Sequence, residues 1–389
     1  MLWERILEEK KKVYQTYEVS PLELIFDLIV VFACSELTKH LLEHFNILGV
    51  IEAMIMLIAV YNLWTYTSFG ATLIHNRRMT SRWMVLSVML LGIFLNSGIE
   101  KAFGENPWIF VVPYLSSQLG QGIFTMIFGK GEGLKYHYRI LTLWNLATAP
   151  IWIIGAFMWP EARVVFWGIA AFIDLIGLWF AHPAPGKKRS TENVEFDAKH
   201  MLERCRLFLI IALGEVVFTL IEALIESPVG YMTIILGVAS FITIVSMWAL
   251  YFWGADHLVA RHFEKAKDAI RTAHLSMNGL FITVAGLILF SVGMRIIIEH
   301  PLAHNTQLLN GILFTGPILY LAAQGWYMWY VVKKAPWARA AASVALAVFG
   351  ILNLQWHSYI SLLLVMSVMM LLTFTVVFMN KREAGPNPV

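Results

Sequence analysis

The chain has 389 residues, of which 58% are hydrophobic and only 14% are charged. A soluble domain carries about 25% charged residues, and apolar runs of about 20 residues recur along this chain, so composition excludes an ordinary soluble domain. The net charge of +3 is spread over short loops, which leaves no basic domain for nucleic acid. The composition predicts an all-α polytopic membrane protein whose main partner is the lipid bilayer.

Twelve membrane-spanning helices are predicted in chain order. Their ranges are 20–42, 49–74, 80–100, 107–128, 138–158, 162–182, 202–225, 229–255, 269–297, 307–332, 337–355 and 357–380. The residues before them contain no apolar stretch typical of a signal peptide, and they form either a short interfacial helix or a solvated tail. Cys34 and Cys205 lie in or beside predicted helices, so neither a disulfide nor a metal motif is expected.

The connecting loops predict the orientation of the chain. Lys and Arg gather after every second span, as at Arg77 and Arg78 or at Lys187 and Lys188. The alternate loops carry at most one or two basic residues, such as Arg163. Because basic loops stay on the cytoplasmic side, both termini are expected to be cytoplasmic.

The two halves of the chain resemble each other. An offset of 179 residues places Glu36 against Glu215, and LIVVFACSE in the first span against LFLIIALGE in the seventh. We therefore predict two parallel six-helix repeats, 1–182 and 201–389, joined by a cytoplasmic linker at 183–200. Repeats of six spans enter from the same side, so a pseudo-two-fold axis along the membrane normal would relate them.

Acidic side chains in the first and seventh spans are the main candidates for chemistry. A carboxylate in hydrocarbon needs a cation or several hydrogen-bond donors, or it takes up a proton. Glu36 and Glu215 are groups that bind a proton or a cation, structural acids, or catalytic carboxylates. The offset also places Asp27 against Arg206, which predicts a salt bridge across the axis, separate pairs within each half, or a gating pair.

Other polar residues of the predicted spans are further candidates. Asp174 has no cation in its own helix, so it is either an ion-binding group or a hydrogen-bonded structural acid. His274 and Asn278 lie one turn apart, and His274 is either a structural residue or a ligand. The groups expected to form a cytoplasmic gate or polar network are Glu23, His200, Glu203, Arg204, Arg206 and Asn278.

Several chemistries lack their motif in this chain. There is no Walker loop, G-x-G-x-x-G, H-E-x-x-H or G-x-S-x-G segment, and no soluble domain large enough to bind a nucleotide. No cofactor, metal site or catalytic residue is therefore predicted. If the protein transports a solute, it does so without hydrolysing ATP itself.

Two long segments carry a resemblance to a known family. LELIFDLIVVFACSELTKHL contains L-E-L-x-F-D-L, and HMLERCRLFLIIALGEVVFTL contains H-x-x-E-R-x-x-L-F-x-I-I-A-L-G-E. A later helix, AHLSMNGLFITVAGLIL, begins with a histidine. The chain resembles the bacterial low temperature requirement protein A (LtrA) family along its whole length.

The resemblance implies a multi-pass protein of the bacterial cytoplasmic (inner) membrane, linked by name to growth in the cold, and it implies no settled activity. The residues that match the family's motifs are Glu23, Phe26, Asp27, His200, Glu203, Arg204, Gly214, Glu215 and His274. Family members often place a glycine at Cys205 or Arg206, which marks Arg206 as a local feature of this chain.

Together these features predict a secondary transporter of a small solute or ion that is coupled to protons. Glu36 and Glu215 would bind the proton or cation, and Asp27 would belong to the gate. An ion channel is one alternative. An intramembrane enzyme or lipid-handling protein that uses His274 and Asp174 is another.

Overall fold

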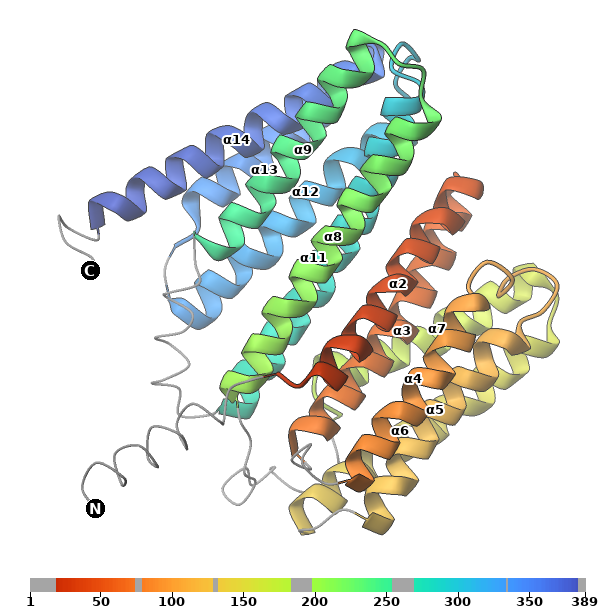
Figure 1. Ribbon diagram of the computed structural model, residues 1–389. Coiled ribbons are helices and arrows are strands. Elements are labelled where there is room, and N and C mark those ends of the chain that lie inside the picture. The colour runs from red at the N-terminus through yellow and green to blue at the C-terminus, as the bar shows by residue number, and fades with distance from the viewer. Residues whose placement is uncertain are drawn as a thin grey trace, which may run out of the picture. The chain divides into compact units, whose positions relative to one another are not determined.

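The computed structural model describes residues 19–73, 79–128, 132–182, 198–253, 269–333 and 335–383. Within these ranges the chain forms twelve α-helices, one for each predicted span (Figure 1). They are α2 Pro21–Glu43, α3 Ile47–Leu73, α4 Met79–Ser97, α5 Trp108–Phe128, α6 Glu132–Phe157, α7 Pro160–Trp179, α8 Ala198–Glu226, α9 Tyr231–Phe252, α11 Ala269–Glu299, α12 Gln307–Tyr327, α13 Trp337–Leu352 and α14 Ser358–Glu383. A π-helical turn, Met328–Val332, extends α12, and a 3-10 turn, Asn353–Gln355, follows α13. The predicted all-helical class is confirmed.

Nine of the helices in the described ranges are long and apolar enough to cross a membrane, which makes the chain a polytopic membrane protein. The helix α4 contributes a shorter apolar stretch, Arg82–Ser97. The predicted N-terminal segment, most of the linker and the end of the C-terminal tail lie outside the described residues. The predicted orientation of the termini stays a prediction.

Contacts divide the chain into two compact units, which are described separately. The first unit comprises Met1–Glu36, Ile51–Phe208 and Ala266–Asn278, and the second comprises Leu37–Val50, Leu209–Lys265 and Gly279–Val389. In the first unit α4, α5, α6 and α7 pack in chain order, each against the next (Figure 1). In the second unit α14 packs against α9 and α13, and α13 packs against α12. The symmetry between two six-helix repeats stays a prediction.

Helix α2 has an exposed apolar face, and its acids near the start lie on the buried face. Ile25, Leu28 and Phe32 are each about half exposed and follow one another at helical spacing. Glu23 and Asp27 lie one turn apart on the other face, where both are buried. This arrangement is the reverse of a soluble amphipathic helix, and it directs both acids into the protein.

The first turn of α7 carries a buried arginine that serves the local fold. The guanidinium of Arg163 donates to the carbonyl oxygens of Ala102 at 3.0 Å, Gly104 at 2.9 Å and Met158 at 2.9 Å. These carbonyls belong to the α4–α5 loop and to the end of α6. Arg163 therefore fastens two neighbouring connections of the first unit, which explains a cation that stands outside the basic loops.

Two glycines bring the backbones of α11 and α12 into contact in the second unit. A Cβ atom on Gly286 would lie 2.6 Å from the carbonyl oxygen of Gly316, and one on Gly316 would lie 2.7 Å from that of Gly286. Only glycine at both positions permits so close an approach. Pro317 follows directly in α12, where it removes a backbone hydrogen bond.

Candidate functional site

The start of α2 fixes the first acid of the candidate site. Both the backbone N–H and the hydroxyl of Ser20 donate to Glu23 Oε2 at 2.9 Å, and the Glu23 N–H donates back to the Ser20 hydroxyl at 3.3 Å. This reciprocal pattern is a capping box, and Pro21 occupies the first helical position, where its missing N–H costs nothing. Glu23 is thus held by its own helix, and its side chain is buried.

Asp27 lies one turn further along α2 and meets two donors from other helices. The indole N–H of Trp64 in α3 donates to Asp27 Oδ1 at 2.7 Å. The guanidinium of Arg204 in α8 donates to the same oxygen at 2.5 Å. Asp27 and Arg204 are both fully buried, so this is an ion pair inside the first unit.

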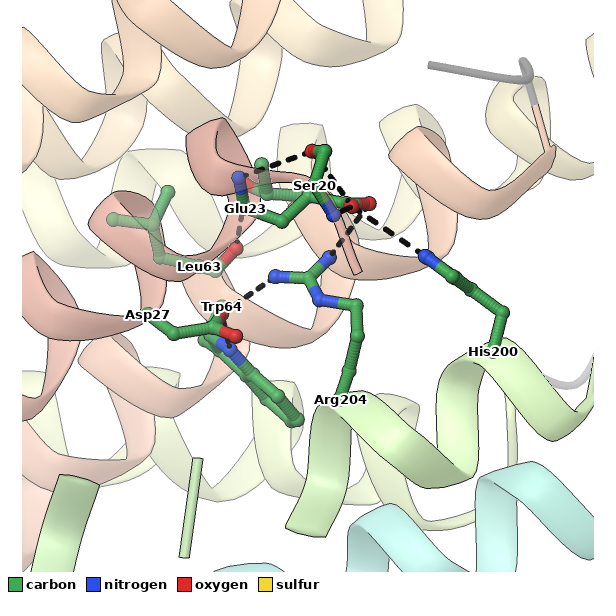
Figure 2. Close-up of polar contacts among 8 residues, drawn as sticks. Ser20, Glu23, Asp27, Leu63, Trp64, His200 and Arg204 are labelled. Atoms are coloured by element: carbon green, nitrogen blue, oxygen red, sulfur yellow. Dashed lines mark hydrogen bonds and ion pairs between the residues drawn. The ribbon is translucent and has the colours of Figure 1, made fainter. Parts of the chain in front are cut away.

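Arg204 reaches both acids of α2 from a single position. Figure 2 shows its guanidinium extending from α8 toward Glu23 and Asp27. Its Nη1 atom lies 3.8 Å from Glu23 Oε1. His200, one turn earlier in α8, places its Nε2 atom 3.4 Å from Glu23 Oε2. We call Glu23, Asp27, His200 and Arg204 the ion-pair cluster.

Aromatic rings enclose the guanidinium. The Cζ atom of Arg204 lies 5.9 Å from the ring centroid of Phe26 and 6.0 Å from that of Trp64, distances at which a ring attracts a cation. Trp64 in turn packs against Tyr61 and Phe208, with centroid distances of 5.2 and 4.6 Å. Buried beside these rings, the charged groups lie in surroundings of low dielectric, which strengthens the charge interactions within the cluster.

The cluster still has unused hydrogen-bonding capacity. Four of its buried atoms make no hydrogen bond within the described structure: Glu23 Oε1, Asp27 Oδ2, Arg204 Nε and Arg204 Nη1. Buried polar atoms in proteins normally have a partner, which can be water or a bound ligand. The arrangement can therefore accept a further proton, water molecule or small polar group.

The charges of the four side chains do not balance when the imidazole is neutral. Two carboxylates then face one guanidinium, so the net charge is −1. One additional proton, on His200 or on a carboxyl group, makes the cluster neutral. Because a buried net charge is costly, the cluster is chemically suited to binding one proton.

The structure corrects the predicted partner of Asp27. Within the described residues Asp27 pairs with Arg204 and not with Arg206, so the predicted Asp27–Arg206 salt bridge is wrong. Arg206 donates instead to Glu203 at 2.8 Å on the half-exposed side of α8. The two arginines are two residues apart on a helix and therefore point in different directions. Of the predicted gating groups, Glu23, His200 and Arg204 lie together, and Glu203 and Arg206 lie apart from them.

The remaining predicted residues do not join the ion-pair cluster. Glu36 and Glu215 are each half-buried and belong to different compact units, so their joint site stays a prediction. His274 is half-buried, with its ring centroid 6.3 Å from that of Phe69. Asn278 donates to the carbonyl oxygen of Trp179 at 3.2 Å, which is a structural role at the end of α7.

Asp174 lies in a second buried polar group of the first unit. Its Oδ2 atom accepts a hydrogen bond from the Tyr114 hydroxyl at 2.9 Å and one from the Trp152 indole at 3.0 Å. Within the described residues no arginine or lysine pairs with this carboxyl group. The donors come from α5 and α6, so no local pattern in α7 announces them. Their presence supports the prediction of a hydrogen-bonded acid.

The described residues contain no group of three or more His, Cys, Asp and Glu side chains placed to hold a metal ion. Cys34 and Cys205 are both buried, and no disulfide joins them.

Sequence reasoning missed Ser20 and Trp64 as parts of the site. The Ser20 contribution could have been found, because S-P-L-E is a capping-box pattern with proline at the first helical position. Trp64 is one of fifteen tryptophans, and nothing in its neighbours marks it as the donor to Asp27.

Comparisons with known proteins show the family of the chain. The family model "Bacterial low temperature requirement A protein (LtrA)" matches residues 18–377. The chain is 29% identical over 309 residues to "Uncharacterized protein RA0937" of Rhizobium meliloti (strain 1021), covering 78% of this chain and 75% of that one. No solved structure matches the chain. Because the family model spans nearly all of the sequence, including both helices of the ion-pair cluster, the chain belongs to the bacterial low temperature requirement A (LtrA) family.

Proposed function

We propose that this protein is a proton-coupled secondary transporter of a small solute or ion, and that the ion-pair cluster takes up the coupling proton. The observation that carries the proposal is the imbalance between Glu23 and Asp27 on one side and Arg204 on the other, all within membrane-protein helices. Ionisable groups in such a setting are costly, and they commonly mark proton or substrate pathways.

Charge balance gives the cluster two neutral states. In one state a proton neutralises it, and in the other a bound cation does so at the free carboxylate oxygens of Glu23 and Asp27. The two ligands would compete, because both relieve the same net charge. Such competition is what couples a proton to a transported ion. A small cation is therefore the substrate class that the cluster fits best.

The acids of α2 and α8 would act at different depths. Glu36 lies nine residues beyond Asp27, which is about 13 Å along the helix axis. We retain Glu36 and Glu215 as groups that bind the proton or cation on the remaining part of the pathway. The function proposed for the ion-pair cluster does not require them to meet.

A liposome flux assay tests the proposal. The full chain is reconstituted with a pH-sensitive dye inside, and gradients of sodium, potassium or methylammonium chloride are applied in turn. We expect one of these gradients to drive proton movement. In the Asp27→Asn variant the rate should fall at least about tenfold, the factor that corresponds to 1.4 kcal/mol. If no gradient in the panel moves protons through the unaltered protein, the proposal fails.

The matched control is Glu299→Gln, which also removes a carboxylate from an arginine. Glu299 accepts from Arg295 at 2.8 Å, but this pair is part-exposed and lies in the second unit. The control should keep the full rate. Electrical currents at channel rates in a planar bilayer would contradict a transporter and favour a channel.

A further inference from the structure

Helix α7 ends in a backbone that returns a histidine to the helix bundle. Ala181 and His182 both have a φ of 55°, in the left-handed region that disfavours residues with side chains. The His182 N–H donates to the carbonyl oxygen of Gly177 at 2.7 Å, which closes the turn. A strained backbone persists where the surrounding structure holds it, and such positions gather at functional sites.

The space for the imidazole ring depends on Gly177. A Cβ atom there would lie 3.0 Å from the Cδ2 and Nε2 atoms of His182, which is tighter than nearly all real contacts. The ring is buried, and its centroid lies 5.9 Å from that of Trp144 in α6. The turn and the glycine together place His182 inside the first unit instead of in the polar linker that follows it.

The His182 ring has a hydrogen-bond partner in α3, and the tautomer of the ring sets which of the two groups donates. His182 Nε2 meets the hydroxyl of Tyr66 in α3. A tyrosine hydroxyl that donates to Nε2 requires a neutral imidazole with its own proton on Nδ1. Another tyrosine, Tyr138 in α6, donates to the carbonyl oxygen of Tyr66 at 3.2 Å and is thereby already engaged.

A series of hydrogen-bonded neutral side chains joins His182 to Asp174. Asn62 lies one turn before Tyr66 in α3, and its amide also interacts with the Tyr66 hydroxyl. The Asn62 Nδ2 atom donates to the Tyr114 hydroxyl at 3.3 Å. Tyr114 donates in turn to Asp174, which also accepts from Trp152. Asn62 thus connects two tyrosines, one of which donates to an acid while the other is hydrogen-bonded to a histidine.

One atom in this series of hydrogen-bonded side chains lacks a hydrogen-bond partner among the described residues. Asn62 Oδ1 is buried and makes no hydrogen bond among the described residues. If His182 gained a proton at Nε2, the ring would become a donor, and the Tyr66 hydrogen would need a new acceptor. Rotation of the Asn62 amide offers Oδ1 as that acceptor. Protonation would then satisfy the unpaired oxygen, and Asp174 would supply the opposite charge.

We propose that His182 is a second proton-binding site, with Asn62 as the residue that positions Tyr66 and Asp174 as the counter-charge. The ligand is a proton from water at the end of α7. The inference does not depend on transport, because it concerns a titration of the resting protein.

Nitrogen-15 NMR of the full chain tests the inference. Histidine is labelled in the reconstituted protein, and the His182 signal is assigned by its loss in His182→Gln. We expect this imidazole to become doubly protonated as the pH falls. In Asn62→Leu its midpoint should fall by about one pH unit, because the displaced Tyr66 hydrogen then has no acceptor. Asp174→Asn should also lower it, because the counter-charge is lost.

The matched control is Asn96→Leu, which removes another buried amide of the first unit. Asn96 donates to the carbonyl oxygen of Ile29 at 2.7 Å and is not part of the hydrogen-bonded series that leads to His182. It should leave the midpoint unchanged. Should Asn62→Leu not fold, Tyr66→Phe serves instead, since it removes the hydroxyl and should change the midpoint. A His182 that stays neutral throughout, or a midpoint insensitive to Asn62 and Tyr66, overturns the inference whatever the flux assay shows.

Discussion

The two buried aspartates of the first unit are stabilised by different kinds of partner. Asp27 meets the guanidinium of Arg204 as well as an indole N–H. Asp174 meets an indole N–H and a phenol, and no arginine or lysine pairs with it in the described parts of the chain. One region is therefore an ion pair, and the other is a carboxyl group held by neutral dipoles.

The difference predicts opposite tolerances to a change of charge. Removing one partner of a buried ion pair leaves the other charge uncompensated, which is strongly destabilising. Neutral donors make hydrogen bonds to a carboxylate or to an amide oxygen alike, so the Asp174 region should tolerate loss of its charge. Two aspartates that look equivalent in a list of intramembrane acids should thus differ clearly in experiments.

The largest effect is expected for Arg204→Met, which leaves Glu23 and Asp27 buried without their cation. We expect a loss of about 3–5 kcal/mol in the free energy of unfolding. An unfolding titration in mixed detergent micelles measures it. The control is Arg206→Met, two residues away, whose pair with Glu203 is half-exposed and should contribute less than about 1 kcal/mol. Equal losses in the two variants would remove the distinction between buried and exposed pairs.

A direct comparison of the aspartates comes next. Asp27→Asn should cost about 2–3 kcal/mol, less than a full ion pair because Glu23 still faces Arg204. Asp174→Asn should cost about 1 kcal/mol or less, because Tyr114 and Trp152 can still donate to the amide oxygen. The same titration gives both values. A larger loss at Asp174 than at Asp27 would contradict the assignment of an ion pair to one and neutral dipoles to the other.

The indole donors Trp64 and Trp152 allow a second comparison of the Asp27 and Asp174 regions. Trp152→Phe should cost about 1–2 kcal/mol, because it removes one of the few donors to Asp174. Trp64→Phe should cost about 1 kcal/mol, because Arg204 still holds Asp27. Each substitution also removes some aromatic packing, so the difference between them is the informative quantity. The titration should rank Trp152→Phe as the more destabilising of the pair.

The smallest effect is expected at the start of α2. Ser20→Ala removes one half of the capping box and should cost about 1 kcal/mol. Ser20→Asp is the matched control, because aspartate also caps helices, although it places a second negative charge beside Glu23. If Ser20→Ala costs nothing, Arg204 and His200 alone determine the position of Glu23.

The helices could be predicted from the sequence far better than the site. Twelve apolar stretches gave twelve helices, and nine of those in the described ranges are long and apolar enough to cross a bilayer. The ion-pair cluster was predicted in part: the acids and bases of the two long motifs were identified, and the wrong arginine was assigned to Asp27. The offset between the two halves of the sequence placed Arg206 at the same depth in the membrane as Asp27.

Direction around the helix decides the pairing instead. His200 and Arg204 are four residues apart and share a face, whereas Arg206 lies about 200° around from Arg204. The spacing H-x-x-x-R therefore contained the information. The Asp174 region could not be predicted in this way, because its donors lie 60 and 22 residues away in sequence. His182 was predicted only as the last residue of the sixth span, since a left-handed turn of non-glycine residues has no clear sequence signal.

The contact between Gly286 and Gly316 has a mechanical consequence for the second unit. Gly316 lies near the middle of α12, so the two backbones approach each other most closely at the centre of this helix. Pro317, the residue after Gly316, removes a backbone hydrogen bond and makes this the place where α12 bends most readily. The half of the helix beyond it carries Gln324, whose amide oxygen accepts from the buried Arg339 at 3.1 Å. A small bend at Pro317 would therefore move Gln324 and, through this hydrogen bond, the guanidinium of Arg339.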